Sequence, residues 1–147
     1  FTKTFAIPGI RLGYMLSRDT ELLNKIKKHL PEWNVSRIAE RTGEAAAEVL
    51  DTTDYLETSV RLIKKEREYL TKQLESLGVK VYESDTNYLL LRSREDLYDR
   101  LIEKGILIRR CENFSGLDRS HFRIAIRRHE ENEELIKYVS KIARCDC

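Results

Sequence analysis

The sequence predicts a mixed α/β (α+β) protein, in which a mainly helical first half precedes a small sheet of three or four strands with helices packed on one face. Two observations lead to this prediction. Up to Gly78, apolar residues recur mostly at the three- and four-residue spacing of amphipathic helices. Beyond Gly78, short alternating or wholly apolar runs are separated by two helical segments, in the order β-β-α-β-β-α.

Three helices are expected in the first half, at residues 20–30, 36–50 and 55–77. The capping candidates are Asp19 or Thr20, Ser36, and Thr53 or Asp54, and the residues that end helices are Pro31 and Gly78. The third helix would be roughly 35 Å long at 1.5 Å per residue. It is expected to connect two structural regions and to place its apolar stripe, Leu56 to Leu74, in the core.

Strands are expected at residues 79–82, 88–91, 106–108 and 122–127, and helices at residues 95–104 and 130–142. The apolar run Leu12–Leu16 predicts a further strand in the first half. We therefore expect three regions, over residues 1–52, 53–78 and 79–147. Trp33 is expected to anchor packing, and the three histidines are given no role.

Composition and charge argue against several classes of protein. A net charge of +2, from 27 basic and 25 acidic residues, is not typical of a dedicated nucleic-acid or membrane-surface protein. No apolar run approaches the roughly 20 residues that cross a bilayer, and no signal-peptide pattern opens the chain. Cys111, Cys145 and Cys147 form neither a CxxC pair nor a cluster with histidine. We expect reduced thiols in a cytoplasmic protein, and no metal site.

Two cations near the start of the sequence could carry chemistry. Lys3 stands in the apolar stretch FTKTFAI, where burial would lower the pKa of its ammonium group and make the neutral amine available. The Pro8-Gly9 pair predicts a tight turn that would bring Arg11 back toward Lys3. An aldehyde cofactor that carries a phosphate needs both an amine and a guanidinium. The alternative is that both residues are solvated surface charges.

The stretch FTKTFAIPGIRLGY resembles the lysine loop of fold-type-I pyridoxal-phosphate enzymes, the aminotransferase superfamily, through a Thr-Lys pair and G-x-R-x-G-Y at residues 9–14. A second block is similar to the C-terminal domain of histidinol-phosphate aminotransferases and threonine-phosphate decarboxylases. It consists of RRCENFSGL, FRIAIR and ENEELI, beginning at residues 109, 122 and 131. Its C-x-N-F-x-G-L pattern favours the decarboxylase branch.

The resemblance implies a cofactor, pyridoxal 5'-phosphate, and residues that would hold it. Lys3 is similar to the Schiff-base lysine, which also moves a proton between the substrate carbon and the cofactor. Thr2 would lie beside it at the cofactor, and Arg11 would bind the cofactor phosphate.

The resemblance also implies a small-molecule substrate, a phosphorylated amino acid or amine. Arg123 would bind its α-carboxylate, Arg109 its phosphate, and Asn87 would lie near it. Arg110 departs from the pattern, because the decarboxylase-like relatives usually carry an acidic residue there. Without the resemblance, Arg123 would be interpreted as an outward residue of an alternating strand, and Arg109 as a solvated strand edge.

The resemblance further implies that residues 1–52 are the end of a large cofactor-binding domain and that residues 79–147 are the small C-terminal domain of the same fold. The expectation is therefore the C-terminal portion of a longer, homodimeric enzyme, incomplete by itself. Two other classes remain as alternatives. One is a non-catalytic folded module for binding or assembly, and the other is a nucleic-acid binder through the paired arginines, against which the near-neutral charge argues.

Overall fold

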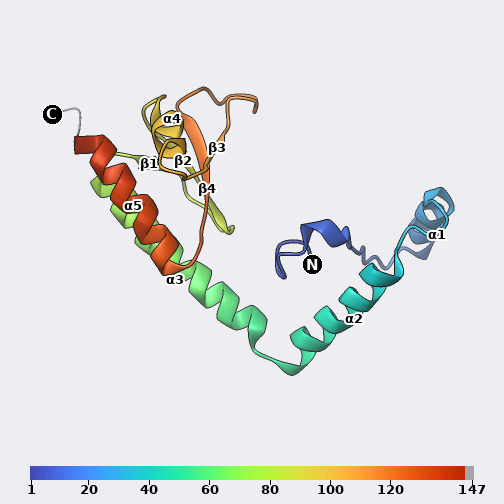
Figure 1. Cartoon of the computed structure of the whole chain (residues 1–147). Coiled ribbons are helices and arrows are strands. Elements are labelled where there is room, and N and C mark those ends of the chain that lie inside the picture. Colours follow the sequence, from blue (N-terminus) through green and yellow to red (C-terminus); the bar gives the residue numbers. More distant parts are fainter. Residues whose placement is uncertain (145–147) are drawn as a thin grey trace. The chain divides into compact units, whose positions relative to one another are not determined.

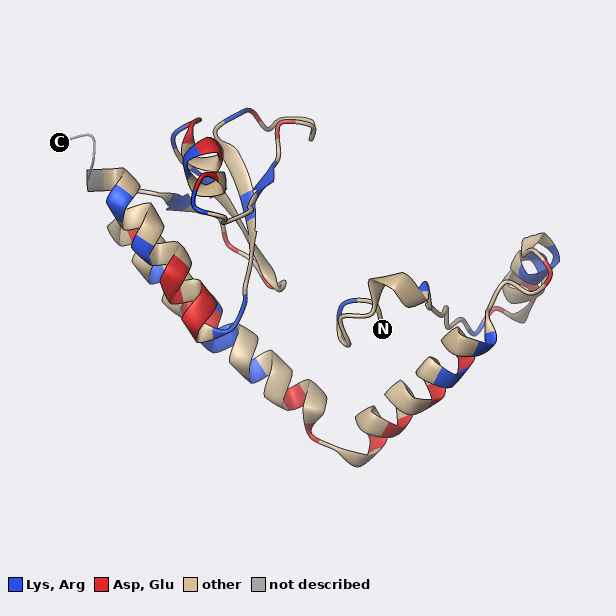
Figure 2. Ribbon diagram, in the orientation of Figure 1, with Lys and Arg blue, Asp and Glu red and all other residues tan. Residues whose placement is uncertain are grey.

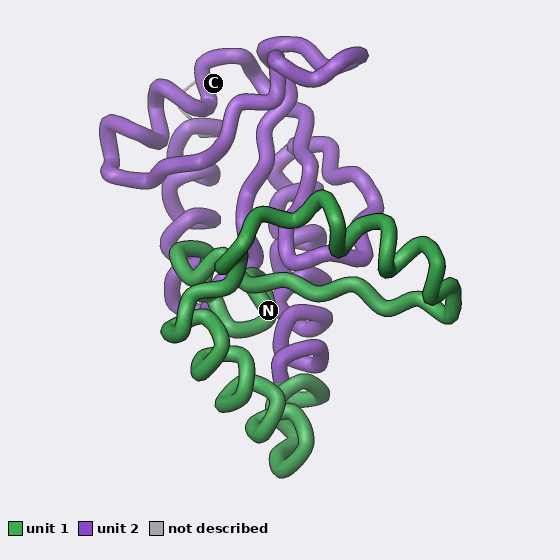
Figure 3. Tube along the Cα trace, turned by 90° about the vertical axis from the view of Figure 1, so that its right-hand side faces the viewer, with its two compact units in different colours: residues 1–58 green, residues 59–147 purple. Residues whose placement is uncertain are grey.

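In a computed structural model that describes residues 1–144, the chain divides into two compact units, residues 1–58 and the residues from Ser59 onward (Figures 1 and 3). The division falls within the long helix that was predicted as a connector. The expected three-part division therefore stays a prediction. Cys145 and Cys147, two of the three thiols that were expected to be reduced, lie outside the described residues.

The first unit is helical. It contains a 3-10 turn, η1 (Pro8–Ile10), the helices α1 (Thr20–His29) and α2 (Arg37–Thr52), and the start of α3 (Tyr55–Ser76). Two predicted caps are confirmed. Asp19 Oδ1 accepts a hydrogen bond from the Leu22 N–H at 2.9 Å, and Ser36 Oγ accepts one from the Ala39 N–H at 3.1 Å. Each bond satisfies a backbone donor that has no partner within its helix.

Three expectations for the apolar residues of this region are wrong. Residues 12–16 are not a strand, since no other part of residues 1–144 pairs with their backbone, and Leu16 is 85% exposed. Trp33 anchors no packing, because it is 94% exposed on a backbone with φ of 57°. The stripe along α3 is only partly core: Leu70 and Leu74 are buried, whereas Leu56 is about half exposed.

The second unit is an antiparallel sheet with three helices. Its strands are β1 (Lys80–Val81), β2 (Tyr88–Arg92), β3 (Arg109–Arg110) and β4 (His121–Ala125), in the spatial order β1-β2-β4-β3. The helices are α4 (Leu97–Ile102), α5 (His129–Arg144) and most of α3. This arrangement confirms the predicted α/β class and the predicted β-β-α-β-β-α order.

One predicted strand is displaced along the chain. The run at residues 106–108 was expected to pair, but β3 begins only at Arg109. The reason is the end of α4, where Gly105 adopts a φ of 75° and the Ile106 N–H still bonds to the Leu101 carbonyl. Ile108 is buried all the same, so the apolar run contributes to the core without joining the ladder.

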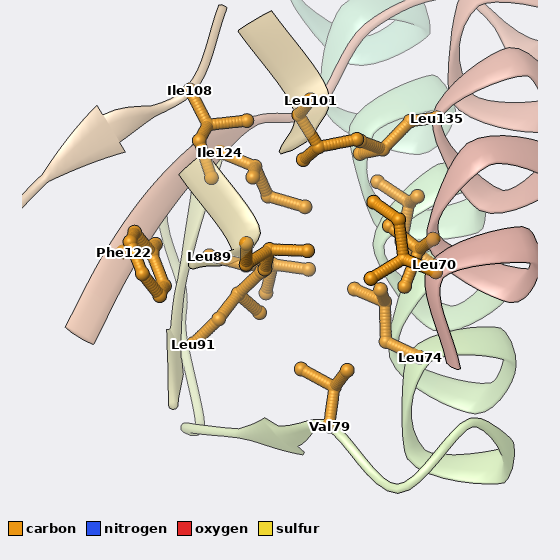
Figure 4. Packing of buried hydrophobic residues seen from close by; sticks show 13 residues of the cluster. Leu70, Leu74, Val79, Leu89, Leu91, Leu101, Ile108, Phe122, Ile124 and Leu135 are labelled. Atoms are coloured by element: carbon orange, nitrogen blue, oxygen red, sulfur yellow. The ribbon is translucent and has the colours of Figure 1, made fainter. Parts of the chain in front are cut away.

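The core lies on one face of the sheet. Leu89 is opposite Ile124 and Leu91 is opposite Phe122, so these four side chains share a face. Figure 4 shows the helix residues that meet this face, and they include Leu70, Leu74, Leu101 and Leu135.

No helix within residues 1–144 is long and apolar enough to cross a bilayer.

Helices α3 and α5 are joined by a buried polar cluster. Glu66 on α3 is 1% exposed, and its carboxylate accepts hydrogen bonds from Asn132 Nδ2 at 2.9 Å and from His129 Nδ1 at 3.1 Å. Burial alone would raise the pKa of Glu66, but these two hydrogen bonds outweigh it and hold the pKa below its ordinary value. Asn132 also bonds to both backbone groups of Arg127, so the cluster fixes the connection between β4 and α5.

Candidate anion-binding site

The segment around Lys3 is a compact turn in the first unit. The Phe5 N–H bonds to the Phe1 carbonyl at 3.0 Å, and the Ile7 N–H bonds to the Thr2 carbonyl at 3.2 Å. The expected burial of Lys3 is wrong for this structure, in which the residue is exposed. The neighbouring rings pack elsewhere, since Phe5 stacks on the Tyr55 ring at 5.2 Å between centroids. The amine of Lys3 is therefore accessible.

Arg11 ends the 3-10 turn that the Pro8-Gly9 pair was expected to make. It adopts a left-handed backbone with φ of 55°, and its Nη1 lies 3.5 Å from the Pro8 carbonyl oxygen. Arg11 is exposed, and within residues 1–144 no hydrogen bond joins it to Lys3. Thr2, Lys3 and Arg11 thus share one short segment, and their roles at a cofactor stay predictions.

In the second unit, the sheet register brings Arg109 and Arg123 together. They are direct partners in the pairing of β3 with β4, so their side chains lie on one face. Alternation places Leu90 on that face as well, because it is opposite Arg123 on β2. We call this face, opposite the core, the outer face. Figure 2 shows basic segments on β3 and β4, in contrast to the acidic start of α5.

Each of these two arginines stacks on an aromatic ring. The guanidinium carbon of Arg109 lies 5.3 Å from the centroid of Phe114, and that of Arg123 lies 4.7 Å from the centroid of Tyr88. Such contacts hold a guanidinium in place without neutralising its charge. Both side chains can therefore still donate hydrogen bonds in the plane of the guanidinium group.

Neither arginine has an ion pair within residues 1–144, although other arginines of the second unit do. Arg110 Nη2 lies 2.5 Å from Asp99 Oδ1, and Arg127 Nη2 lies 2.6 Å from Glu131 Oε1. Like charges directly opposite each other on paired strands are destabilising. An uncompensated pair of this kind on one face is typical of a site that receives an anion.

The departure at Arg110 has a structural explanation. Its strand partner is Phe122, so alternation places Arg110 on the core face, opposite to Arg109. There it stacks on the Tyr98 ring at 4.4 Å and pairs with Asp99, both of which belong to α4. Arg110 therefore fastens α4 to the edge of the sheet and does not enlarge the pair on the outer face.

Asn87 is not grouped with the two arginines. It lies one residue before β2, where its carbonyl accepts the Ile126 N–H at 2.9 Å, and it is exposed. Continued alternation gives it the face of Leu89, which is the core face. Its expected place near the substrate stays a prediction.

Cys111 directly follows β3 and is a free thiol that is 2% exposed. Burial raises the pKa of this thiol, and the charges of Arg123 and Arg109 oppose that shift without overcoming it. The thiol is thus kept protonated beside the two guanidiniums. No group of three or more potential metal ligands occurs within residues 1–144.

Sequence reasoning missed the side chains that support this site. Tyr88 contacts Arg123 from the neighbouring strand β2, and Phe114 contacts Arg109 from the loop that follows β3, and no local spacing predicts either contact. His121, which was given no role, is buried and bonded to Asp118 and Tyr82. The stretch Asp118-Arg119-Ser120 carried a usable signal, because an aspartate side chain often accepts the backbone N–H two residues on and so favours a turn.

Comparisons with known proteins agree with this structure. Residues 1–139 match the family model for aminotransferase class I and II. The chain is 37% identical to threonine-phosphate decarboxylase of Salmonella typhimurium over 92% of the chain and 37% of that protein. Histidinol-phosphate aminotransferase of Clostridium acetobutylicum matches at 37% identity, with a TM-score of 0.88 over 98% of this chain and 44% of its own.

A third relative was solved with the cofactor that the sequence suggested. It is histidinol-phosphate aminotransferase from Sinorhizobium meliloti in complex with pyridoxal-5'-phosphate, which matches at 26% identity and a TM-score of 0.78, over all of this chain and 40% of its own. The chain thus spans about two fifths of the length of these relatives. The match to the family model over most of the sequence shows that the chain belongs to the class I and II aminotransferase family.

Proposed function

We propose that the chain supplies part of the active site of a pyridoxal-phosphate-dependent aminotransferase that acts on a phosphorylated amino acid or amine. The observation that carries this proposal is the pair Arg109 and Arg123, which are cross-strand partners on the outer face and have no carboxylate partner within residues 1–144. The histidinol-phosphate and threonine-phosphate enzymes among the relatives support a substrate with a phosphate group.

The residues of the first unit fit the cofactor in their chemistry. Lys3 presents an accessible primary amine, which suits an aldehyde, and Arg11 presents an exposed guanidinium, which suits a phosphate. When bound, pyridoxal 5'-phosphate withdraws electrons from the bonds of the substrate's Cα. Lys3 Nζ would then accept and return the proton at that carbon, while Thr2 and Arg11 hold the cofactor.

Two guanidiniums also give the substrate a defined orientation. Arg123 would bind the α-carboxylate and Arg109 the phosphate, each through paired N–H donors. The cross-strand register fixes the backbone positions of the two arginines, and the rings of Phe114 and Tyr88 hold their guanidiniums, so a substrate with both anionic groups is preferred over one with either alone.

Decarboxylation is the second candidate reaction. The 37% identity to the Salmonella typhimurium decarboxylase and the C-x-N-F-x-G-L pattern at Cys111 support it. The two reactions break different bonds of the same carbon, so the products distinguish them. Release of carbon dioxide marks decarboxylation, and transfer of the amino group with retention of the carboxylate marks transamination.

Substitutions in the full-length protein test the proposal. Lys3→Ala abolishes turnover of either kind, and retained turnover would contradict the assignment. Arg109→Gln raises KM for the phosphorylated substrate by about 10- to 100-fold, since charged hydrogen bonds contribute about 1.5–3 kcal/mol. The matched control is Arg110→Gln, the neighbour on the opposite face, which leaves KM unchanged. We also propose that the whole protein is a homodimer, which analytical ultracentrifugation tests. We propose a cytoplasmic location as well, which cell fractionation tests.

A further inference from the structure

Residues 112–120 form most of the loop between β3 and β4. Phe114, which stacks on Arg109, belongs to this loop and is 44% exposed. Its N–H bonds to the Cys111 carbonyl at 3.0 Å, and the Leu117 N–H bonds to the Phe114 carbonyl at 3.1 Å. The position of the Phe114 ring therefore depends on how the loop is fastened to the sheet.

His121 fastens the base of this loop. Its Nδ1 lies 2.7 Å from Asp118 Oδ1 in the loop, and its Nε2 lies 3.1 Å from the hydroxyl of Tyr82. A neutral imidazole satisfies both contacts when Nδ1–H donates to the carboxylate and Nε2 accepts from the phenol. Tyr82 continues β1 by bonding to the Leu90 carbonyl, so the connection crosses β2 from one strand to the other.

Asp118 gathers further donors on the same oxygen. Ser120 donates to Asp118 Oδ1 from its hydroxyl at 2.5 Å and from its N–H at 2.9 Å. The Ser120 hydroxyl bond is the largest cause, followed by His121, of a pKa for Asp118 of about 2. Ser120 is itself held to the sheet, because its carbonyl accepts the Ser93 N–H at 2.9 Å.

We propose that Tyr82, His121 and Asp118 act as positioning residues for the anion site, by holding the loop so that Phe114 stays against Arg109. The proposal deepens the proposed function, on which it rests, and concerns the phosphate half of the substrate. None of the three residues needs to touch the anion. These residues hold the loop, the loop holds the Phe114 ring, and the ring holds the guanidinium of Arg109.

Phosphate binding to the 147-residue chain, measured by isothermal titration calorimetry with inorganic phosphate at pH 7, tests the inference. Phe114→Leu removes the ring and weakens the affinity about two- to fivefold, as expected for an exposed cation–π contact. Phe114→Tyr retains the ring and keeps the affinity of the wild type. Tyr82→Phe removes only the hydroxyl group that bonds to His121 Nε2, and it weakens the phosphate affinity by a similar factor.

A double-mutant cycle separates positioning from general destabilisation. In the Phe114→Leu background, Tyr82→Phe has no further effect on the phosphate affinity, because its route to Arg109 is already lost. An undiminished effect in that background overturns the inference. Asp118→Asn provides a second variant at the loop end of the same connection and gives the same pattern. Circular dichroism at the titration temperature confirms that each variant is folded.

The control is Tyr138→Phe. Tyr138 lies on α5, and its hydroxyl makes no hydrogen bond within residues 1–144. We expect this variant to bind phosphate with unchanged affinity. Arg109→Gln distinguishes a failure of the anion site from a failure of the positioning role. If the wild type binds phosphate no better than Arg109→Gln, the anion site itself is refuted, and the inference with it. If Arg109→Gln loses binding while Tyr82→Phe and Asp118→Asn bind like the wild type, only the inference is overturned.

Discussion

Replacing Asn132 with alanine is expected to destabilise the second unit strongly. Asn132 is 1% exposed and makes three hydrogen bonds: to Glu66 Oε2, to the Arg127 carbonyl and from the Arg127 N–H, at 2.9, 2.9 and 3.1 Å. Each bond contributes about 1 kcal/mol, and the buried carboxylate left with a single partner adds about 1–2 kcal/mol. We therefore expect Asn132→Ala to lower the free energy of unfolding by about 3–5 kcal/mol.

Urea denaturation at pH 7, followed by far-ultraviolet circular dichroism, measures this change, and hydrogen exchange of the β4 amides assigns it to the second unit. Asn24→Ala is the matched control, since Asn24 is an exposed residue of α1 and its loss should change the free energy by less than about 0.5 kcal/mol. A loss below about 1 kcal/mol for Asn132→Ala would refute the view that this cluster fixes the end of β4.

Three further predictions concern the pH dependence of stability, the loop aspartate Asp118 and the core of the second unit. The hydrogen bond to Glu66 raises the pKa of His129, so the stabilising contribution of His129 is present below pH 6.5 and is lost as the pH rises through the raised pKa. The pKa of Glu66 is lowered, so the stabilising contribution of Glu66 is present above pH 4.5 and is lost on acidification. The free energy of unfolding, measured from pH 4 to 9, should thus be greatest between about pH 4.5 and 6.5. His129→Gln should abolish the loss of stability on the alkaline side. The carboxyl group of Asp118 should titrate near 2 by NMR, and Ser120→Ala should move its midpoint toward 3.8. Phe122→Ala should cost about 3–5 kcal/mol in urea denaturation, because this fully buried ring leaves a cavity.

Local signals predicted most of the secondary structure. Asp19 and Ser36 cap their helices as expected, because capping depends on residues within one turn. The apolar run at residues 12–16 failed because strand formation depends on a distant partner, which composition cannot show. Ile106 lies outside β3 for a related reason, since its backbone completes the end of α4.

The candidate site was only half predictable. The resemblance named Arg109 and Arg123, but their adjacency follows from the pairing of β3 with β4, which the sequence did not specify residue by residue. The stacking of Tyr88 and Phe114 depends on the same pairing and on the path of a loop. The expected burial of Lys3 was wrong because its aromatic neighbours pack against other rings rather than around the amine.

The most direct test of the central claim is an NMR titration of the arginine side-chain Nε–H resonances with inorganic phosphate. We expect the signal of Arg109, which is assigned to the substrate phosphate, to shift and to saturate at one phosphate per chain, while that of Arg127, paired with Glu131, stays in place. An unmoved signal of Arg109, or equal shifts of Arg109 and Arg127 without saturation, would contradict the proposal.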